Sequence, residues 1–216
     1  VRFSLYDEEE IRKLSAGAVL SNEQFKIAKP VPGGIYDTSM GTTSTSYNCT
    51  SCLYDSSKCL GHQGHLELNY PTMNSIMIVE IKKWLKIICH GCSLPIFSMN
   101  DLMKETPKNR FEQAVKMATS AKANIKCYYC GFLQPAISKS SDTSIFPRMK
   151  YYDVDTYNKS NNKKFNKMED IYPHKMYEIF SRISEQTLTF FGFNKSNAPI
   201  NYIMNVIPIP PVTMRP

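Results

Sequence analysis

Features that mark secreted and membrane-spanning proteins are missing from this sequence. The first ten residues, VRFSLYDEEE, are acidic and lack the basic segment and apolar segment that open a secretory signal. No run of apolar residues approaches the length of about 18 that a membrane-spanning helix needs. The sequence therefore predicts a soluble, intracellular protein with no membrane partner.

Motifs of common enzyme classes are missing as well. The chain has no G-x-S-x-G nucleophile elbow, no phosphate-binding P-loop and no glycine-rich dinucleotide turn. Its apolar fraction of 42% is nevertheless ordinary for a globular protein, and 216 residues suffice for one large domain or two small ones. We expect a folded core, and the sequence predicts no catalytic residue.

Apolar spacing and capping residues predict several helices. Trp84 lies on the clearest apolar stripe, and Asp7 and Ser184 are placed to cap the first and last of these helices. Helices are expected over residues 7–14, 75–88, 110–122, 173–183 and 184–192.

The remaining segments predict turns and short strands. Residues 29–43 contain two prolines and three glycines, which favour consecutive turns without a regular element. The last stretch, NYIMNVIPIPPVTMRP, predicts a strand that continues into a proline-stiffened exit. Together with the helices, these segments indicate an α+β fold of mixed helices and short strands.

A segment rich in lysine and asparagine lies in the last third of the chain. The stretch YNKSNNKKFNK at 157–167, within residues 153–170, is poor in aliphatic side chains. We expect a surface insertion there, and a loop that contacts phosphates is the second interpretation.

The chain contains seven cysteines, an odd number that fits disulfides poorly. In a reducing compartment, paired cysteines indicate metal ligation rather than disulfides. Six of them form the C-x-x-C pairs Cys49/Cys52, Cys89/Cys92 and Cys127/Cys130, and the seventh is Cys59.

A first zinc site is expected within residues 43–68. Cys49, Cys52 and Cys59 offer three thiolates, and zinc prefers four tetrahedral ligands drawn from thiolate and imidazole. His62 is the expected fourth ligand, because Cys59-Leu-Gly-His62 repeats the two-residue spacing. His65, three residues further along, could compete for this position.

A second zinc site is expected within residues 89–130. It takes the four cysteines that remain, Cys89, Cys92, Cys127 and Cys130. Spacing alone leaves a crossed pairing open, in which Cys49/Cys52 would share an ion with Cys89/Cys92. His90 falls between two ligands of a set that is already full, and His174 is interpreted as a helix-surface residue.

A reactive zinc site is the competing interpretation. The sequence His65-Leu66-Glu67 followed by Cys89-x-x-Cys92 superficially matches the H-x-E…C-x-x-C pattern of zinc deaminases. No proline immediately precedes a C-x-x-C pair, however, and this choice leaves the other cysteines without a role. Sites closed by four protein ligands have no position for a reactive water, so the expected role is structural.

The motifs and their order resemble one known family. SLYDEEEIRKLS, GGIYDTSMGTT and C-x2-C-x6-C-x-G-H-x-G-H-L-E-L come first, and EIFSRIS and VIPIPPVTMRP follow the second cysteine set. This order resembles the N-terminal clamp of the largest subunit of multi-subunit DNA-directed RNA polymerases, over nearly the whole chain. The stretches GGIYDTSMGTT, EIKKWLKIIC and IYPHKMYEIFSRIS are most similar to enzymes of large cytoplasmic DNA viruses of the African swine fever virus type, and a protist nuclear enzyme is the competing source.

The resemblance carries several implications. Residues 1–216 would be a clamp core fragment that forms one wall of the DNA cleft, braced by two structural zinc ions. The family's zinc ligands fall on Cys49, Cys52, Cys59 and His62, and on Cys89, Cys92, Cys127 and Cys130. The family's magnesium-binding N-A-D-F-D-G-D loop is absent from this sequence, so the chain would be inactive alone and Mg²⁺ would belong to the complete polymerase.

The resemblance also implies partners and a location. The partners would be the remaining part of the largest subunit, the second-largest subunit, other polymerase subunits, template DNA and the RNA–DNA hybrid. The location would be the host cytoplasm or virion for a viral enzyme and the nucleus for a cellular one.

A free-standing zinc module that binds nucleic acid is the alternative function. The formal net charge of +7 suggests an anionic partner, although thiolates at metal sites would reduce it. Such a module would bind duplex DNA with sub-micromolar affinity and a steep salt dependence. The sequence assigns no particular lysine to nucleic acid.

Overall fold

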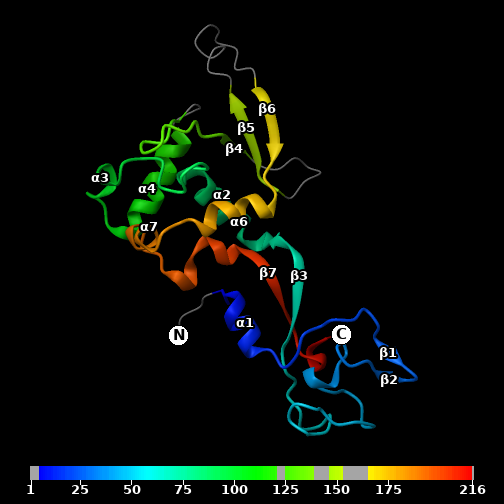
Figure 1. Cartoon of the computed structure of the whole chain (residues 1–216). Coiled ribbons are helices and arrows are strands. Elements are labelled where there is room, and N and C mark those ends of the chain that lie inside the picture. Colours follow the sequence, from blue (N-terminus) through cyan, green and yellow to red (C-terminus); the bar gives the residue numbers. More distant parts are fainter. Residues whose placement is uncertain (1–4, 121–124, 139–145, 153–164, 216) are drawn as a thin grey trace. The chain divides into compact units, whose positions relative to one another are not determined.

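The computed structural model describes residues 5–120, 125–138, 146–152 and 165–215. The chain divides into two compact units (Figure 1). The helical unit comprises Val1–Leu5 and Pro71–Ile203, and the loop unit comprises Tyr6–Tyr70 and Met204–Pro216. Each unit therefore combines segments that are distant in the sequence.

The helical unit is built around helix α2 (Ile78–Ile87), which follows the 3-10 turn η2 (Ser75–Met77). Trp84 of α2 is fully buried, and its ring centroid lies 4.9 Å from that of Phe111 and 5.0 Å from that of Phe193. Among the described residues, the other helices of this unit are α3 (Met99–Leu102), α4 (Pro107–Ser120), α6 (Pro173–Ser181) and α7 (Glu185–Phe190), and two 3-10 turns follow, η3 (Lys195–Asn197) and η4 (Pro199–Tyr202). The aromatic cluster around Trp84 brings α2, α4 and the segment after α7 together.

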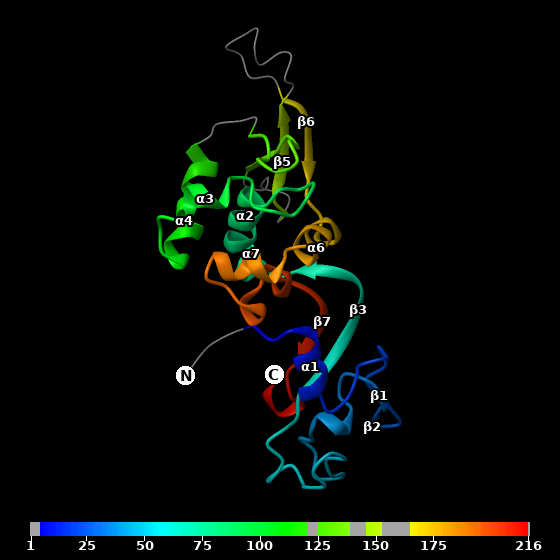
Figure 2. The same ribbon diagram turned by 60° about the vertical axis from the view of Figure 1, so that its left-hand side comes forward.

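A three-stranded antiparallel sheet belongs to the same unit (Figure 2). Its strands are β4 (Ala136–Ser138), β5 (Arg148–Tyr152) and β6 (Phe165–Asp170), in that order. Arg148 lies opposite Asp170, and their side chains form an ion pair of 2.9 Å. This cross-strand pair supports the register of β5 and β6.

The loop unit has less regular structure. It contains α1 (Glu8–Leu14), the strands β1 (Phe25–Lys26) and β2 (Lys29–Pro30), and the 3-10 turns η1 (Thr38–Met40) and η5 (Val212–Met214). Strands β3 (Gly64–Met73) and β7 (Ile203–Ile209), most of whose residues belong to this unit, pair in a two-stranded sheet. Its buried apolar side chains are few: Ile11, Met40, Val206 and Val212, together with the thiols of Cys49 and Cys59.

A bidentate ion pair fixes α1 against β3. Arg12 Nε and Nη2 donate to the two carboxylate oxygens of Glu67 at 2.7 and 3.0 Å. At the start of α1, Asp7 and Glu10 form a reciprocal capping box, as expected for a helix that begins at this position.

The α+β prediction is confirmed, and the expected helices are present with shifted ends. The helix expected at 75–88 begins with the 3-10 turn η2, and the helix expected at 110–122 is α4, which begins at Pro107. Positions 121 and 122 lie outside the described residues. Among the described residues, no helix is both long and apolar enough to cross a membrane.

Other expectations need correction. Residues 29–43 include β2 and η1, so the prediction of turns without any regular element was wrong. The short ladder between β1 and β2 forms because a tight turn brings Phe25 opposite Pro30. Residues 153–164 of the expected surface insertion lie outside the described residues, and Phe165–Asp170 form β6.

Candidate metal centres

The loop unit brings together the first group of expected ligands. One ligand atom from each of Cys49, Cys52, Cys59 and His62 lies within 4.8 Å of all the others. Cys59 Sγ is 3.8 Å from His62 Nε2. The backbone N–H of His62 donates to the Met40 carbonyl at 3.1 Å, which positions the imidazole next to a buried part of the unit.

The helical unit brings together the second group. The sulfurs of Cys89, Cys92, Cys127 and Cys130 also lie within 4.8 Å of one another. The Cys89–Cys130 sulfur distance is 3.5 Å and the Cys92–Cys127 distance is 3.7 Å. Cys89 and Cys127 are buried, whereas Cys130 is exposed.

The three C-x-x-C pairs share one backbone conformation. In each pair, the N–H four residues after the first cysteine donates to that cysteine's carbonyl at 2.8–2.9 Å, and the first cysteine's N–H donates to the carbonyl five residues ahead. The residue after the second cysteine has positive φ in all three: Leu53 (63°), Ser93 (58°) and Gly131 (70°). This repeated turn holds both sulfurs of a pair on one side of the backbone.

Hydrogen bonds to sulfur are concentrated on Cys89. The backbone N–H of Gly91 donates to Cys89 Sγ at 3.3 Å, and Gln134 Nε2 donates to it at 3.1 Å. The same Gln134 side chain accepts from the backbone N–H of His90 at 3.1 Å. Donors of this kind stabilise a thiolate and orient it, as groups around metal ligands commonly do.

The thiols of the second group differ in how easily they ionise. A backbone N–H from Phe132 lowers the pKa of exposed Cys130 to about 7, whereas burial raises the pKa of Cys92 to about 12 and also raises that of Cys127. Four adjacent thiols resist full ionisation because each negative charge opposes the next. A divalent cation supplies the missing positive charge, so its binding would release protons.

In the first group, burial would raise the pKa of the Cys49 thiol, but backbone N–H groups of Cys52 and Ser51 outweigh burial and lower it. The C-x-x-C turn therefore supplies the donors that favour a thiolate at this position.

Both groups fit a tetrahedral zinc ion. With Zn–S bonds of about 2.3 Å, tetrahedral geometry places sulfurs about 3.8 Å apart. The sulfur distances of 3.5 and 3.7 Å in the second group are close to this spacing. The expectation of two cysteine-rich groups that could hold metal is confirmed.

The remaining histidines contribute no ligand atom to either group. His65 belongs to neither cluster among the described residues, and its Nδ1 lies 2.7 Å from Ser15 Oγ. His90 Nε2 lies 2.9 Å from the Leu85 carbonyl oxygen, and burial lowers the pKa of His90. His174 stacks on Tyr172, with ring centroids 6.1 Å apart.

The deaminase-like ligand set does not come together. Glu67 is held by Arg12, and Cys89 and Cys92 cluster with Cys127 and Cys130 rather than with His65. The crossed pairing is likewise not found, because each cysteine group is drawn from a single unit. Sequence reasoning missed Gln134, since nothing in the linear order of residues connects it to Cys89.

Comparison with known proteins gives a match over the full chain. The family model described as RNA polymerase Rpb1, domain 1, matches residues 1–216. A "DNA-directed RNA polymerase RPB1 homolog" of African swine fever virus is 31% identical over 216 residues, which cover 100% of this chain and 14% of that protein.

More distant relatives come from cellular organisms. "DNA-directed RNA polymerase subunit Rpo1N" of Thermoplasma acidophilum is 27% identical over 230 residues, 24% of its length. "DNA-directed RNA polymerase II subunit RPB1" of Euplotoides octocarinatus is 29% identical over 233 residues, 47% of its length. Both matches cover 100% of this chain, which thus spans less than half the length of each of these relatives.

Proposed function

Because the chain belongs to the family of RNA polymerase Rpb1, domain 1, we propose that it is the clamp portion of the largest subunit of a DNA-directed RNA polymerase. In this role it forms one wall of the DNA cleft and helps hold the template DNA and the RNA–DNA hybrid during transcription. The observation that carries the proposal is the family match over all 216 residues. Relatives whose names identify them as polymerase subunits support it.

Two structural zinc ions are part of the proposal. Cys49, Cys52, Cys59 and His62 would hold the first, and Cys89, Cys92, Cys127 and Cys130 the second. Bound zinc would supply cross-links between segments that bury little apolar surface of their own. The chain's own residues contribute stiffness, because the repeated turns and the Gln134 amide fix the directions of the ligand atoms.

Catalysis belongs to other parts of the proposed enzyme. The sequence contains no N-A-D-F-D-G-D loop, so the magnesium ions of nucleotidyl transfer would be bound outside this chain. The proposed partners are the rest of the largest subunit, the second-largest subunit and other polymerase subunits. The proposed location is the host cytoplasm or virion for a viral enzyme, or the nucleus for a cellular one.

Metal content tests the zinc sites. Elemental analysis of the purified chain should give two zinc ions per molecule, and Cys59→Ser should reduce this to one and expose residues 43–68 to limited proteolysis. Ser57→Ala is the matched control, because Ser57 lies in the same loop and offers no expected ligand. Fewer than two zinc ions in well-folded wild-type protein would contradict the assignment.

The assembled enzyme tests the clamp role. In a polymerase that contains this chain, photoreactive groups on template DNA should cross-link to residues within 1–216, whereas the isolated chain should incorporate no nucleotide. The isolated chain should also bind duplex DNA weakly, because a single wall does not enclose it. Sub-micromolar binding by the isolated chain that weakens steeply with salt would favour the free-standing module instead.

A further inference from the structure

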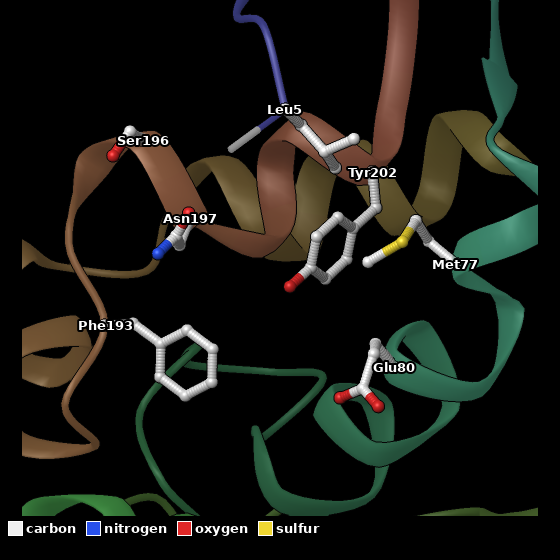
Figure 3. Close-up of a pocket in the computed structure, with 7 residues that line it drawn as sticks. All are labelled: Leu5, Met77, Glu80, Phe193, Ser196, Asn197 and Tyr202. Atoms are coloured by element: carbon white, nitrogen blue, oxygen red, sulfur yellow. The ribbon is translucent and has the colours of Figure 1, made fainter. Parts of the chain in front are cut away.

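A cavity of about 450 Å³ lies within the helical unit (Figure 3). None of its lining residues belongs to a cysteine group, and its volume is in the range of ligand-binding sites. The lining residues come from η2, α2, η3, η4 and the neighbouring segments, and they are Leu5, Met77, Glu80, Phe193, Ser196, Asn197 and Tyr202.

Polar and apolar side chains both line the cavity, and Ser196 and Asn197 lie across it from Glu80 (Figure 3). Figure 3 shows the Tyr202 hydroxyl and the Glu80 carboxylate directed toward the same space, with the Phe193 ring beside it. Burial and the nearby charge of Glu80 both raise the pKa of Tyr202, so its hydroxyl remains protonated and can donate. Leu5, Met77 and Phe193 supply the apolar lining.

Glu80 keeps capacity for a further partner. Lys83 Nζ binds its Oε1 at 2.7 Å, and the two side chains are 38% and 33% exposed. An ion pair this exposed is weak, and a carboxylate has about four lone-pair positions to offer. A cation that enters the cavity can therefore share this carboxylate with Lys83.

The indole of Trp84 packs behind the Tyr202 hydroxyl. The side chain of Trp84 is fully buried and does not line the cavity. Burial has the largest effect on the pKa of Tyr202 and raises it, whereas the indole N–H of Trp84 acts as a donor near the hydroxyl oxygen and lowers it. The Tyr202 hydroxyl proton can therefore be donated to an acceptor in the cavity.

These features indicate which chemical group the cavity would bind. The occupant must donate to Glu80, offer an acceptor to the Tyr202 hydroxyl, and place an apolar stem between Met77 and Phe193. The charge of Glu80 disfavours anions. A guanidinium suits this carboxylate better than a second ammonium, because its planar fork can bind two carboxylate oxygens and stack on an aromatic ring.

We propose that the cavity receives an arginine side chain, with its adjoining backbone carbonyl, from a polypeptide segment outside residues 1–216. The guanidinium binds Glu80, and the carbonyl accepts from the Tyr202 hydroxyl. The choice of a polypeptide rests on the proposed function: the chain spans 14% of the viral relative, so most of such a protein lies outside it.

Trp84, the single tryptophan of the chain, makes binding measurable in the full 216-residue protein. The probes are N-acetyl-arginine methylamide and N-acetyl-citrulline methylamide, which differ in the charge of the side chain and share both amide carbonyls. The arginine probe should shift the Trp84 emission saturably and bind about tenfold or more tightly than the citrulline probe, as a lost charged hydrogen bond predicts.

Variants then locate the contacts. Glu80→Gln should bring the two probes to within about twofold of each other, and Tyr202→Phe should weaken both. Glu112→Gln is the control, because this exposed carboxylate on α4 does not line the cavity and should leave the preference unchanged.

The proposal is overturned by the absence of a saturable shift, by equal binding of the two probes to the wild-type chain, or by a preference that persists in Glu80→Gln. Even if a variant fails to fold, equal binding of the two probes to the wild-type chain would by itself overturn the proposal. Because the assay contains neither DNA nor other subunits, its failure would leave the proposed polymerase role standing.

Discussion

At the scale of single residues, Gln134 connects the two halves of the second cysteine group. Its side chain is 8% exposed and uses both of its polar atoms, donating to Cys89 Sγ and accepting from the His90 N–H. The cysteines could be identified from their spacing because C-x-x-C pairs are local. Gln134 could not, because its partner Cys89 is 45 residues away and ordinary glutamines are mostly surface residues.

Gln134→Leu should weaken the second metal site without removing a ligand. Loss of the donor to Cys89 should reduce zinc affinity by roughly 10–100-fold. The free energy of unfolding should also fall, by about 1–3 kcal/mol, because the buried His90 N–H loses its acceptor. Competition with a zinc-binding dye and urea unfolding measure the two effects.

Gln113→Leu is the control for this change, since Gln113 is exposed on α4. Equal zinc affinity in Gln134→Leu and the wild-type chain would show that the amide does not support the thiolate.

At the scale of elements, the three C-x-x-C turns have one geometry but different residues at the left-handed position. Gly131 adopts positive φ without strain, whereas Leu53 and Ser93 do so against the preference of residues that carry a Cβ. Ser93 is also fully buried, and its hydroxyl has no partner among the described residues. Such strain can be tolerated because a bound metal would hold each turn closed.

Ser93→Gly should therefore raise the free energy of unfolding, by about 1 kcal/mol. Relief of a left-handed backbone is worth about 1–2 kcal/mol, and the added freedom of glycine in the unfolded chain offsets about 0.5–1 kcal/mol of it. Removal of the unpaired hydroxyl adds to the gain. Thermal and urea unfolding at constant zinc measure the change.

The reciprocal substitution Gly131→Ser should lower stability by about 1 kcal/mol through backbone strain alone. A Cβ added at Gly131 would meet no atom within 4 Å, so the added Cβ causes no clash. If Ser93→Gly and Gly131→Ser changed the free energy of unfolding in the same direction, backbone strain at the left-handed position would not explain the two effects.

At the scale of the whole molecule, the two units depend on metal to different degrees. The main apolar cluster, which includes Trp84, Phe111 and Phe180, lies entirely in the helical unit. The loop unit buries only a few apolar side chains, such as Met40 and Val206. Loops with so small a core cannot offset the conformational entropy of folding without cross-links.

Metal removal should therefore unfold the loop unit more completely than the helical unit. After treatment with a chelator, hydrogen exchange read by mass spectrometry should show protection lost throughout residues 6–70, while α2, α4 and α6 keep much of theirs. Chelator preloaded with zinc is the control. Equal loss of protection in both units, or none in either, would contradict this division.

The sequence by itself determined the local features of this protein. C-x-x-C spacing, the Asp7 cap of α1 and the apolar stripe of α2 each lie within a few residues, so the local preferences of the chain suffice to predict them. The order of motifs along the chain also indicated the polymerase family, to which the family match assigns the chain.

The tertiary structure decided what depends on distant segments. It grouped Cys89 and Cys92 with Cys127 and Cys130, placed Gln134 on Cys89, and paired β3 with β7, which lies far from it in the sequence. The cavity beside Trp84 arises in the same way, because Glu80 and Tyr202 lie far apart in the sequence. Such contacts form only when folding closes long loops, and no local pattern records which segments will meet.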